Sequence, residues 1–257
     1  MEYVIICIVA FLASVLTFFS GFGLGTILLP VFALFFPIEV AIALTGVVHF
    51  FNNMFKLGLV GKLANRKVLV YFGIPAVIAA FIGAYVLINI TDLEPLYRYS
   101  LDDHEFEITP VKLIIAVILI AFAIIELLPF IKKLKFETKH LPFGGILSGF
   151  FGGLSGHQGA LRTAFLINSG LSKDAFIATT VVISSFVDFT RLGVYTKRIL
   201  NSGLSDNIPL ILCATLSAII GAVLGKRLLK KVTLDYPTRH FCMSVYAKVR
   251  KLYLTYP

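Results

Sequence analysis

A cluster of polar side chains follows a run of glycines near the middle of an otherwise apolar chain. The stretch GGLSGHQGALRTAFL, residues 152–166, places a His, a Gln and an Arg within six residues. Glycines let the backbone leave a helix, and a short helix that begins after such a break directs free N–H groups and a partial positive charge toward that point. We therefore expect the amides near Gly156, His157 and Gln158 to bind an anion. Close helix packing is the alternative explanation of these glycines.

Arg162 is the charge that such an anion site would need. It lies about one helical turn beyond the glycine break, too deep to reach the membrane surface easily. A central Arg costs about 2.5–3.5 kcal/mol on insertion scales, so it is rarely placed there without purpose. Two roles stay open for it: binding an anionic substrate, or pairing with a buried acid, for which Asp188 is the candidate.

Two polar stripes accompany this motif. One face of the predicted helix 40–60 carries polar residues at spacings of three and four, namely Thr45, His49, Asn52, Asn53 and Lys56. The predicted helix 174–195 repeats the pattern with Thr180, Ser184, Asp188 and Arg191. We expect the two stripes to line one path, with Thr45 and Thr180 near the substrate. The candidates for proton coupling or charge pairing are Asp188, His49 and Asn53.

Some of these residues also have simpler explanations. For His49, an interior histidine whose hydrogen bonds are merely satisfied is an equal alternative to a proton carrier. Lys56 and Arg191 lie near the ends of their spans. We expect both long side chains to extend to the membrane interface.

The composition requires a membrane around these elements. Of 257 residues, 58% are hydrophobic and 14% are charged, whereas about a quarter are charged in soluble domains. Apolar runs of roughly 20 residues are long enough to cross the hydrocarbon as helices. Long runs lie at 3–19, 40–60, 68–90, 111–131, 174–195 and 208–229, and shorter ones at 26–36, 141–155 and 158–170. The sequence therefore predicts an all-α, polytopic integral membrane protein.

The distribution of charge orients the chain in the membrane. The formal net charge of +9 could suggest nucleic acid, but the basic residues are concentrated in short loops, so we expect no nucleic-acid partner. Basic loops stay cytoplasmic, which places 61–67, 132–140 and 226–231 inside, and the acidic loop 91–110 and the N-terminus outside. Residues 232–257 contain no apolar stretch long enough to cross. We predict that they form an amphipathic basic tail on the cytoplasmic lipid surface.

The sequence also contains a repeat. Shifting the chain by 135 residues aligns 20–62 with 155–197 without a gap, and 10 of the 43 pairs are identical. Chemically similar polar pairs are Glu39 with Asp174, Asn53 with Asp188, and Lys56 with Arg191. The predicted topology places the two copies in opposite orientations, so the halves 1–131 and 132–231 are expected to be inverted repeats. Gly-interrupted segments at matching positions of such repeats indicate the midplane site of a transporter.

These motifs resemble the sulfite exporter (TauE/SafE-type) permease family. The likeness covers about residues 1–231 and rests on SGFGLGTILLPVFALFFP, the following IALTGVVHFFNN, and GGLSGHQGALRTAFLINSGLSKDAFIATTVVISSFVDFTRLGVY. The resemblance implies a bacterial or archaeal inner-membrane permease with two homologous halves that exports sulfite, sulfoacetate or related anions. It places the family's glycines at Gly21, Gly23, Gly25, Gly152, Gly153, Gly156 and Gly159, with Arg162 following them. The first motif lacks the adjacent glycines common in the family, and the chain beyond residue 231 lacks the usual final span.

The expected function is a secondary permease that exports a small anion by alternating access. The residues predicted to bind it are Gly156, His157, Gln158, Gly159, Arg162, Gly21, Gly23, Gly25, Thr45 and Thr180. No cofactor and no metal site is predicted, and the expected partners are the anion and the lipid bilayer. Whether copies assemble into a homo-oligomer stays open. The alternatives are an intramembrane hydrolase that uses Ser155, His157 and Ser184, and a membrane scaffold without transport.

Overall fold

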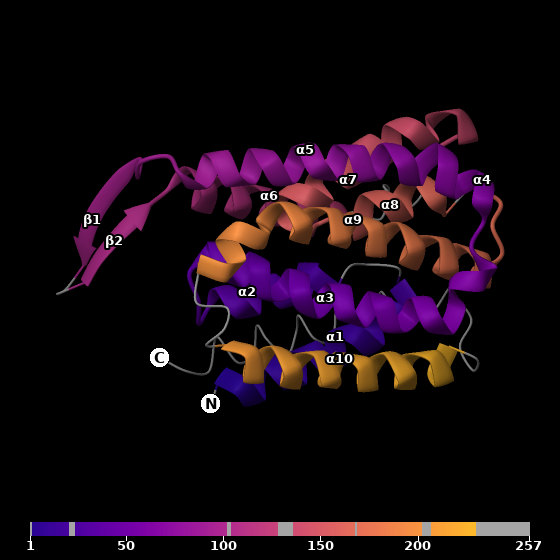
Figure 1. Cartoon of the computed structure of the whole chain (residues 1–257), viewed down its shortest axis with the longest axis horizontal. Coiled ribbons are helices and arrows are strands. Elements are labelled where there is room, and N and C mark those ends of the chain that lie inside the picture. The colour runs from indigo at the N-terminus through magenta and orange to yellow at the C-terminus, as the bar shows by residue number, and fades with distance from the viewer. Residues whose placement is uncertain are drawn as a thin grey trace.

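The long helices of the chain lie side by side along one axis (Figure 1). The computed structural model describes residues 2–20, 24–101, 104–127, 136–167, 169–201 and 207–229. Its helices are α1 (Glu2–Ser20), α2 (Leu24–Ala33), α3 (Ile38–Val60), α4 (Arg66–Val68), α5 (Ile74–Thr91), α6 (Pro110–Leu127), α7 (Leu141–Ser155), α8 (Gly159–Leu166), α9 (Lys173–Asn201) and α10 (Ile208–Leu229). A π-turn at Leu69–Gly73 joins α4 to α5. Each apolar run predicted from the sequence overlaps a helix, and the run 68–90 covers the π-turn and nearly all of α5, which confirms the all-α fold.

Among the described residues, four helical segments are long and apolar enough to cross a bilayer. They are Ile38–Leu63, Arg66–Thr91, Lys173–Thr196 and Ile208–Leu228. Large apolar side chains also cover the outer faces of the bundle: Ile78, Phe81 and Tyr85 on α5, and Leu212, Leu216 and Ile220 on α10 are all more than half exposed. A soluble monomer rarely exposes continuous apolar faces, whereas lipid covers them. The protein is therefore a polytopic membrane protein, as the composition predicted.

The acidic segment between α5 and α6 contains a β-hairpin that sequence reasoning treated only as a loop. Strands β1 (Tyr97–Leu101) and β2 (His104–Ile108) pair antiparallel, with Tyr97 opposite Ile108. Tyr97 and Tyr99 stack on one face of β1 with their ring centroids 6.2 Å apart. The hairpin projects from the end of the bundle opposite α4 (Figure 1).

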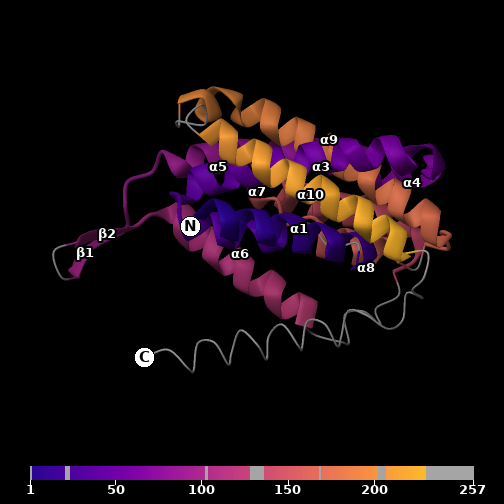
Figure 2. The same ribbon diagram turned by 90° about the horizontal axis from the view of Figure 1, so that it is seen from below.

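The helices pair in a pattern that recurs between the two halves of the chain. α1 packs along α10, α7 packs along α5, and α3 packs against α9 (Figure 2). The first residues of α8 and α9, 159 and 173, follow those of α2 and α3, 24 and 38, by 135 residues. About the same offset relates α1 to α7 and α5 to α10. When each helix is replaced by the helix about 135 residues away, the α1–α10 pair becomes the α7–α5 pair, and the α3–α9 pair stays the same.

Glycines bring the backbones of α5 and α7 into direct contact. Cβ atoms added at Gly145, Gly149 and Gly153 would lie 2.3, 1.9 and 2.0 Å from the carbonyl oxygens of Phe72, Ala76 and Ala80, respectively. These glycines recur every four residues, so they form one face of α7. Membrane helices use such small-residue faces to approach each other closely. Gly153, one of the glycines of the second motif, therefore has a packing role.

Candidate functional site

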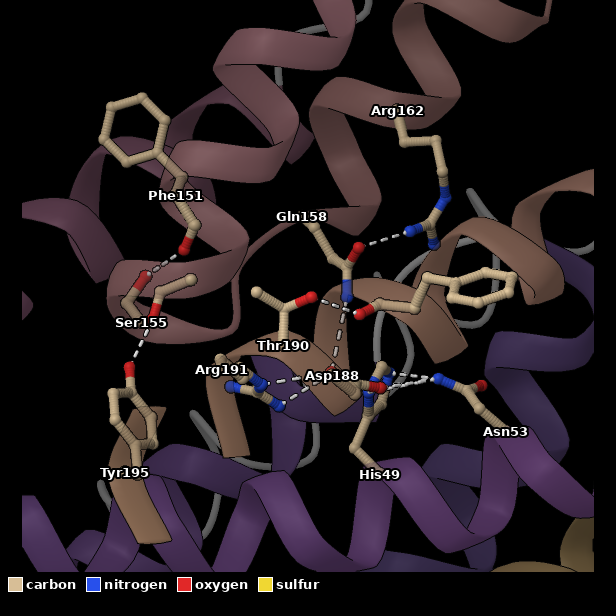
Figure 3. Close-up of polar contacts among 12 residues, drawn as sticks. His49, Asn53, Phe151, Ser155, Gln158, Arg162, Asp188, Thr190, Arg191 and Tyr195 are labelled. Atoms are coloured by element: carbon tan, nitrogen blue, oxygen red, sulfur yellow. Dashed lines mark hydrogen bonds and ion pairs between the residues drawn. The ribbon is translucent and has the colours of Figure 1, made fainter. Parts of the chain in front are cut away.

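A buried polar cluster surrounds Asp188, where α3 crosses α9 (Figure 3). The carboxylate is fully buried, and its Oδ2 lies 2.5 Å from His49 Nδ1 and accepts a 2.9 Å hydrogen bond from Asn53 Nδ2. Its Oδ1 accepts a 3.1 Å bond from Arg191 Nε. A buried charge is tolerated only when it is paired and hydrogen-bonded, and these three partners meet that requirement.

The Asn53–Asp188 hydrogen bond joins two residues that are 135 positions apart in sequence. This separation equals the repeat offset, so each residue is the counterpart of the other. Equivalent positions of two repeats can touch only where the repeats meet face to face. The cluster therefore joins α3 to α9 at two positions that the predicted repeat makes equivalent.

Two cations predicted to reach the membrane interface are instead buried in the protein. Arg191 is 0% exposed and Lys56 is 6% exposed. Arg191 Nη2 also lies 3.0 Å from Asp188 Oδ1, so this Arg forms an ion pair with the central carboxylate. Lys56 lies next to Asn52, whose amide oxygen is 3.2 Å from Lys56 Nζ once the amide is oriented to satisfy both of its ends. The expectation that these side chains extend to the lipid surface is wrong, because their helix faces are covered by the other half of the protein.

A cavity of about 30 Å³ lies beside this cluster. It is lined by Thr17, Leu24, His49, Asn53, Lys56, Arg162, Ile177, Thr180, Val181 and Ser184. Two of these side chains are cations, and no carboxylate lines the cavity among the described residues. One probe-sized water needs about 10–15 Å³, so the space holds only a few small polar groups. The lining is suited to a small anion.

Arg162 reaches the central carboxylate through Gln158 rather than by a direct ion pair. Arg162 Nη1 donates a 2.9 Å hydrogen bond to Gln158 Oε1, and Gln158 Nε2 lies 3.5 Å from Asp188 Oδ1. Figure 3 shows this chain of contacts between α8 and α9. Arg162 is 3% exposed, and its Nε has no hydrogen-bond partner within the described residues. The guanidinium therefore retains donor capacity beside the cavity.

The second glycine motif ends α7 and begins α8 in a tight turn. Gly156 adopts a φ of +84°, a conformation that favours glycine. The amides of Gly156 and Gln158 donate to the carbonyls of Gly152 and Gly156, so both are engaged within the chain. His157 and Gln158 are buried beside this turn, and Gly159 opens α8. The structure thus groups these predicted residues at one turn, next to the cavity but outside its lining.

The first glycine motif meets the second at Gly25. A Cβ added at Gly25 would lie 3.4 Å from the Gly156 carbonyl oxygen and 3.6 Å from Thr45 Cγ2. Gly21 and Gly23, also predicted to bind substrate, lie outside the described residues. Of the two predicted threonines, Thr180 lines the cavity, whereas Thr45 is buried on the other side of the Asp188 cluster.

Two of the three residues of the hydrolase alternative, Ser155 and His157, contact each other. His157 Nδ1 lies 3.0 Å from Ser155 Oγ, but that hydroxyl donates to the Phe151 carbonyl oxygen at 3.1 Å. His157 Nε2 has no hydrogen-bond partner in the part of the chain that the structure describes. An activated serine needs a base that is itself oriented by a third group, and no such group contacts His157 among the described residues.

The fold and the cavity define a polytopic membrane protein with a buried, cation-lined site between its two halves. A family model described as sulfite exporter TauE/SafE matches residues 6–245, so the chain belongs to this family of membrane transporters. The resemblance seen in the sequence ends at about residue 231, whereas the family match continues to residue 245. Residues 230–245 lie outside the described residues. No curated protein and no solved structure matches the chain.

Proposed function

We propose that this protein is a secondary permease that exports sulfite or a small organosulfonate across the cytoplasmic membrane. The observation that carries the proposal is the cavity lined by Lys56 and Arg162 without a lining carboxylate among the described residues. The buried Arg162 guanidinium lies beside this cavity, and its Nε has no hydrogen-bond partner among the described residues. A small oxyanion in the cavity would accept a hydrogen bond from this Nε.

The bound anion would contact groups from both halves. Arg162 would direct its unpartnered Nε at one oxygen, and Lys56 would supply the second positive charge. Ser184 lies in the same lining and can donate its hydroxyl hydrogen. Gln158 would hold the Arg162 guanidinium in place, since it accepts from Nη1. The turn at Gly156–Gly159 then positions α8 and its Arg rather than binding the anion through its own amides.

Transport would follow the alternating-access scheme of inverted repeats, in which one half rocks against the other around a central site. The recurrent helix pairing and the Asn53–Asp188 contact support this arrangement. Because α3 belongs to the first half and α9 to the second, the contacts of Asp188 with His49 and Asn53 cross the interface that rocking would change. These contacts would stabilise one of the two states.

The His49–Asp188 pair is also the proposed point of proton coupling. The two atoms in contact, Nδ1 and Oδ2, can share a proton, and the Asp188 carboxylate is fully buried. Binding or release of a proton there would change the charge beside the anion. Export would then respond to a pH gradient imposed across the membrane.

Flux measured with purified protein in proteoliposomes tests the proposed function. Radiolabelled sulfite should enter in a saturable manner, and excess sulfoacetate or another substrate anion should compete. A pH gradient should change the initial rate, and its collapse should abolish that change. Protein-dependent flux that is absent for sulfite, sulfoacetate and sulfate alike would contradict the assignment and favour the scaffold alternative.

A single variant separates the permease from the hydrolase. Ser155→Ala removes a hydroxyl that only bonds the Phe151 carbonyl and His157. A permease should keep most of its flux in this variant, while a hydrolase that uses Ser155 as its nucleophile would lose all activity.

A further inference from the structure

The counterpart of Lys56 occupies a buried position on the other side of the Asp188 cluster. α3 and α9 run antiparallel, since Gly46 of α3 lies beside Arg191, while Lys56 shares the cavity with Ser184 and Thr180. Asn53 and Asp188 meet between these two levels. Lys56 and Arg191 each lie three residues from that contact, about 4.5 Å along their helices in opposite directions. The two repeat-related cations therefore flank the centre.

The Arg191 guanidinium packs against the backbone of two glycines, Gly156 and Gly46. A Cβ at Gly156 would lie 2.5 Å from Arg191 Nη1, and a Cβ at Gly46 would lie 3.5 Å from Arg191 Cζ. Any larger residue at Gly156 would exclude the guanidinium from this position. The guanidinium thus lies at the junction of α3 with the α7–α8 turn.

Buried polar atoms without partners gather at this junction. Arg191 Nη1, Thr45 Oγ1 and His157 Nε2 are buried and have no hydrogen-bond partner among the described residues. Thr45 and Gly156 both lie against Gly25, and Gly156 lies against Arg191. Such unsatisfied groups cost about 1–3 kcal/mol each and call for an explanation. Together they present a cation and two groups able to donate hydrogen bonds.

We propose that Arg191 and Thr45 form a second anion-binding station, on the side of the Asn53–Asp188 contact opposite the cavity. This inference rests on the permease function proposed above. When the halves rock, the Arg191 side of the interface opens and the Lys56 side closes. The anion then passes from Arg162 and Lys56 to Arg191 and Thr45. By the predicted orientation, the cavity faces the cytoplasm and the second station faces the exterior.

The Thr45→Val variant tests the station without touching the Asp188 cluster. The Thr45 hydroxyl makes no hydrogen bond within the described residues, so its replacement by a methyl group should leave folding intact. Uptake of labelled sulfite would be measured in right-side-out and inside-out membrane vesicles. The half-saturating concentration should rise about tenfold at the external face and stay unchanged at the cytoplasmic face. Lys56→Gln is the matched variant. Its half-saturating sulfite concentration should rise at the cytoplasmic face and not at the external face.

The second station would be overturned if Thr45→Val had the same half-saturating sulfite concentration as wild type at both faces, or if that concentration rose equally at both. Either result would leave the permease function intact. Wild-type vesicles that take up no sulfite and no sulfoacetate in either orientation would instead contradict the permease function. In that case thermal unfolding of the detergent-solubilised protein decides on the station. Sulfite should raise the midpoint temperature of unfolding more for wild type than for Thr45→Val. Equal rises in this temperature for both proteins would overturn the station.

Discussion

At the scale of single residues, the site is organised by one carboxylate and the cations around it. Asp188 holds Arg191 by an ion pair on its own helix and His49 and Asn53 by contacts across the interface. Arg162 and Lys56 remain beside the cavity. The carboxylate thus engages Arg191 through Nε and Nη2, while Arg191 Nη1 and Arg162 Nε have no hydrogen-bond partner among the described residues.

Replacing this carboxylate should damage folding before it damages transport. Asp188→Asn leaves the buried Arg191 guanidinium without its counter-ion, and breaking a buried pair in this way costs about 3–5 kcal/mol. The midpoint of thermal unfolding in detergent should fall clearly. The double variant Asp188→Asn with Arg191→Gln should recover part of that loss, because contacting residues are not additive. A double variant as unstable as the sum of both single variants would contradict the pairing.

At the scale of elements, the contact between α5 and α7 sets the position of the turn at Gly156. Gly145, Gly149 and Gly153 bring α7 against carbonyl oxygens of the α5 segment. The α7–α8 turn follows directly, and Tyr195 of α9 donates to the Gly153 carbonyl oxygen. Small shifts of α7 would therefore move α8 and its Arg162.

A methyl group at this contact should be poorly tolerated. In Gly149→Ala the new Cβ would lie 1.9 Å from the Ala76 carbonyl oxygen, and such overpacking costs about 3 kcal/mol. Gly58→Ala is the matched control, since nothing lies within 4 Å of a Cβ there and Ala favours a helix. The yield of folded protein in size-exclusion chromatography should fall for Gly149→Ala only. Similar yields for both variants would contradict the tight contact.

The helices could be predicted because each carries its own hydropathy signal over ten or more residues. The burial of Lys56 and Arg191 could not, since position within one helix does not say which face the other half covers. The hairpin has a local signal in the sequence, the alternation of Tyr97, Tyr99 and Leu101 before two acidic residues. The Arg162–Gln158 hydrogen bond is not predictable from the sequence alone, because a buried Gln can contact a substrate as well as a neighbour one turn along the helix.

At the scale of the whole molecule, charge separates the two ends of the bundle. The hairpin end of the bundle carries β2, which contains Glu105 and Glu107, and the end of α5, which Asp92 and Glu94 follow (Figure 1). The opposite end carries α4 with Arg66 and Lys67, and the last turns of α10 with Lys226 and Arg227. Basic segments stay in the cytoplasm, which predicts an external hairpin.

Cysteine labelling in intact cells checks this orientation. Single cysteines would be introduced as Ser100→Cys in β1 and Lys67→Cys in α4, in a chain whose three native cysteines are replaced. A membrane-impermeant maleimide should label the first and reach the second only after the membrane is permeabilised. Labelling of Lys67→Cys alone in intact cells would reverse the orientation, and with it the faces assigned to the two anion stations.

The proposed transport mechanism depends on a buried Arg that binds the transported anion. The most direct test is sulfite flux into proteoliposomes with wild type, Arg162→Ala, and Arg98→Ala as a control at an exposed hairpin ion pair. Loss of a buried charged contact costs about 2–5 kcal/mol, so Arg162→Ala should lose at least about 30-fold in kcat/KM while inserting normally. Arg98→Ala should match wild type. Full flux by a correctly inserted Arg162→Ala would remove this Arg from the mechanism and contradict the account.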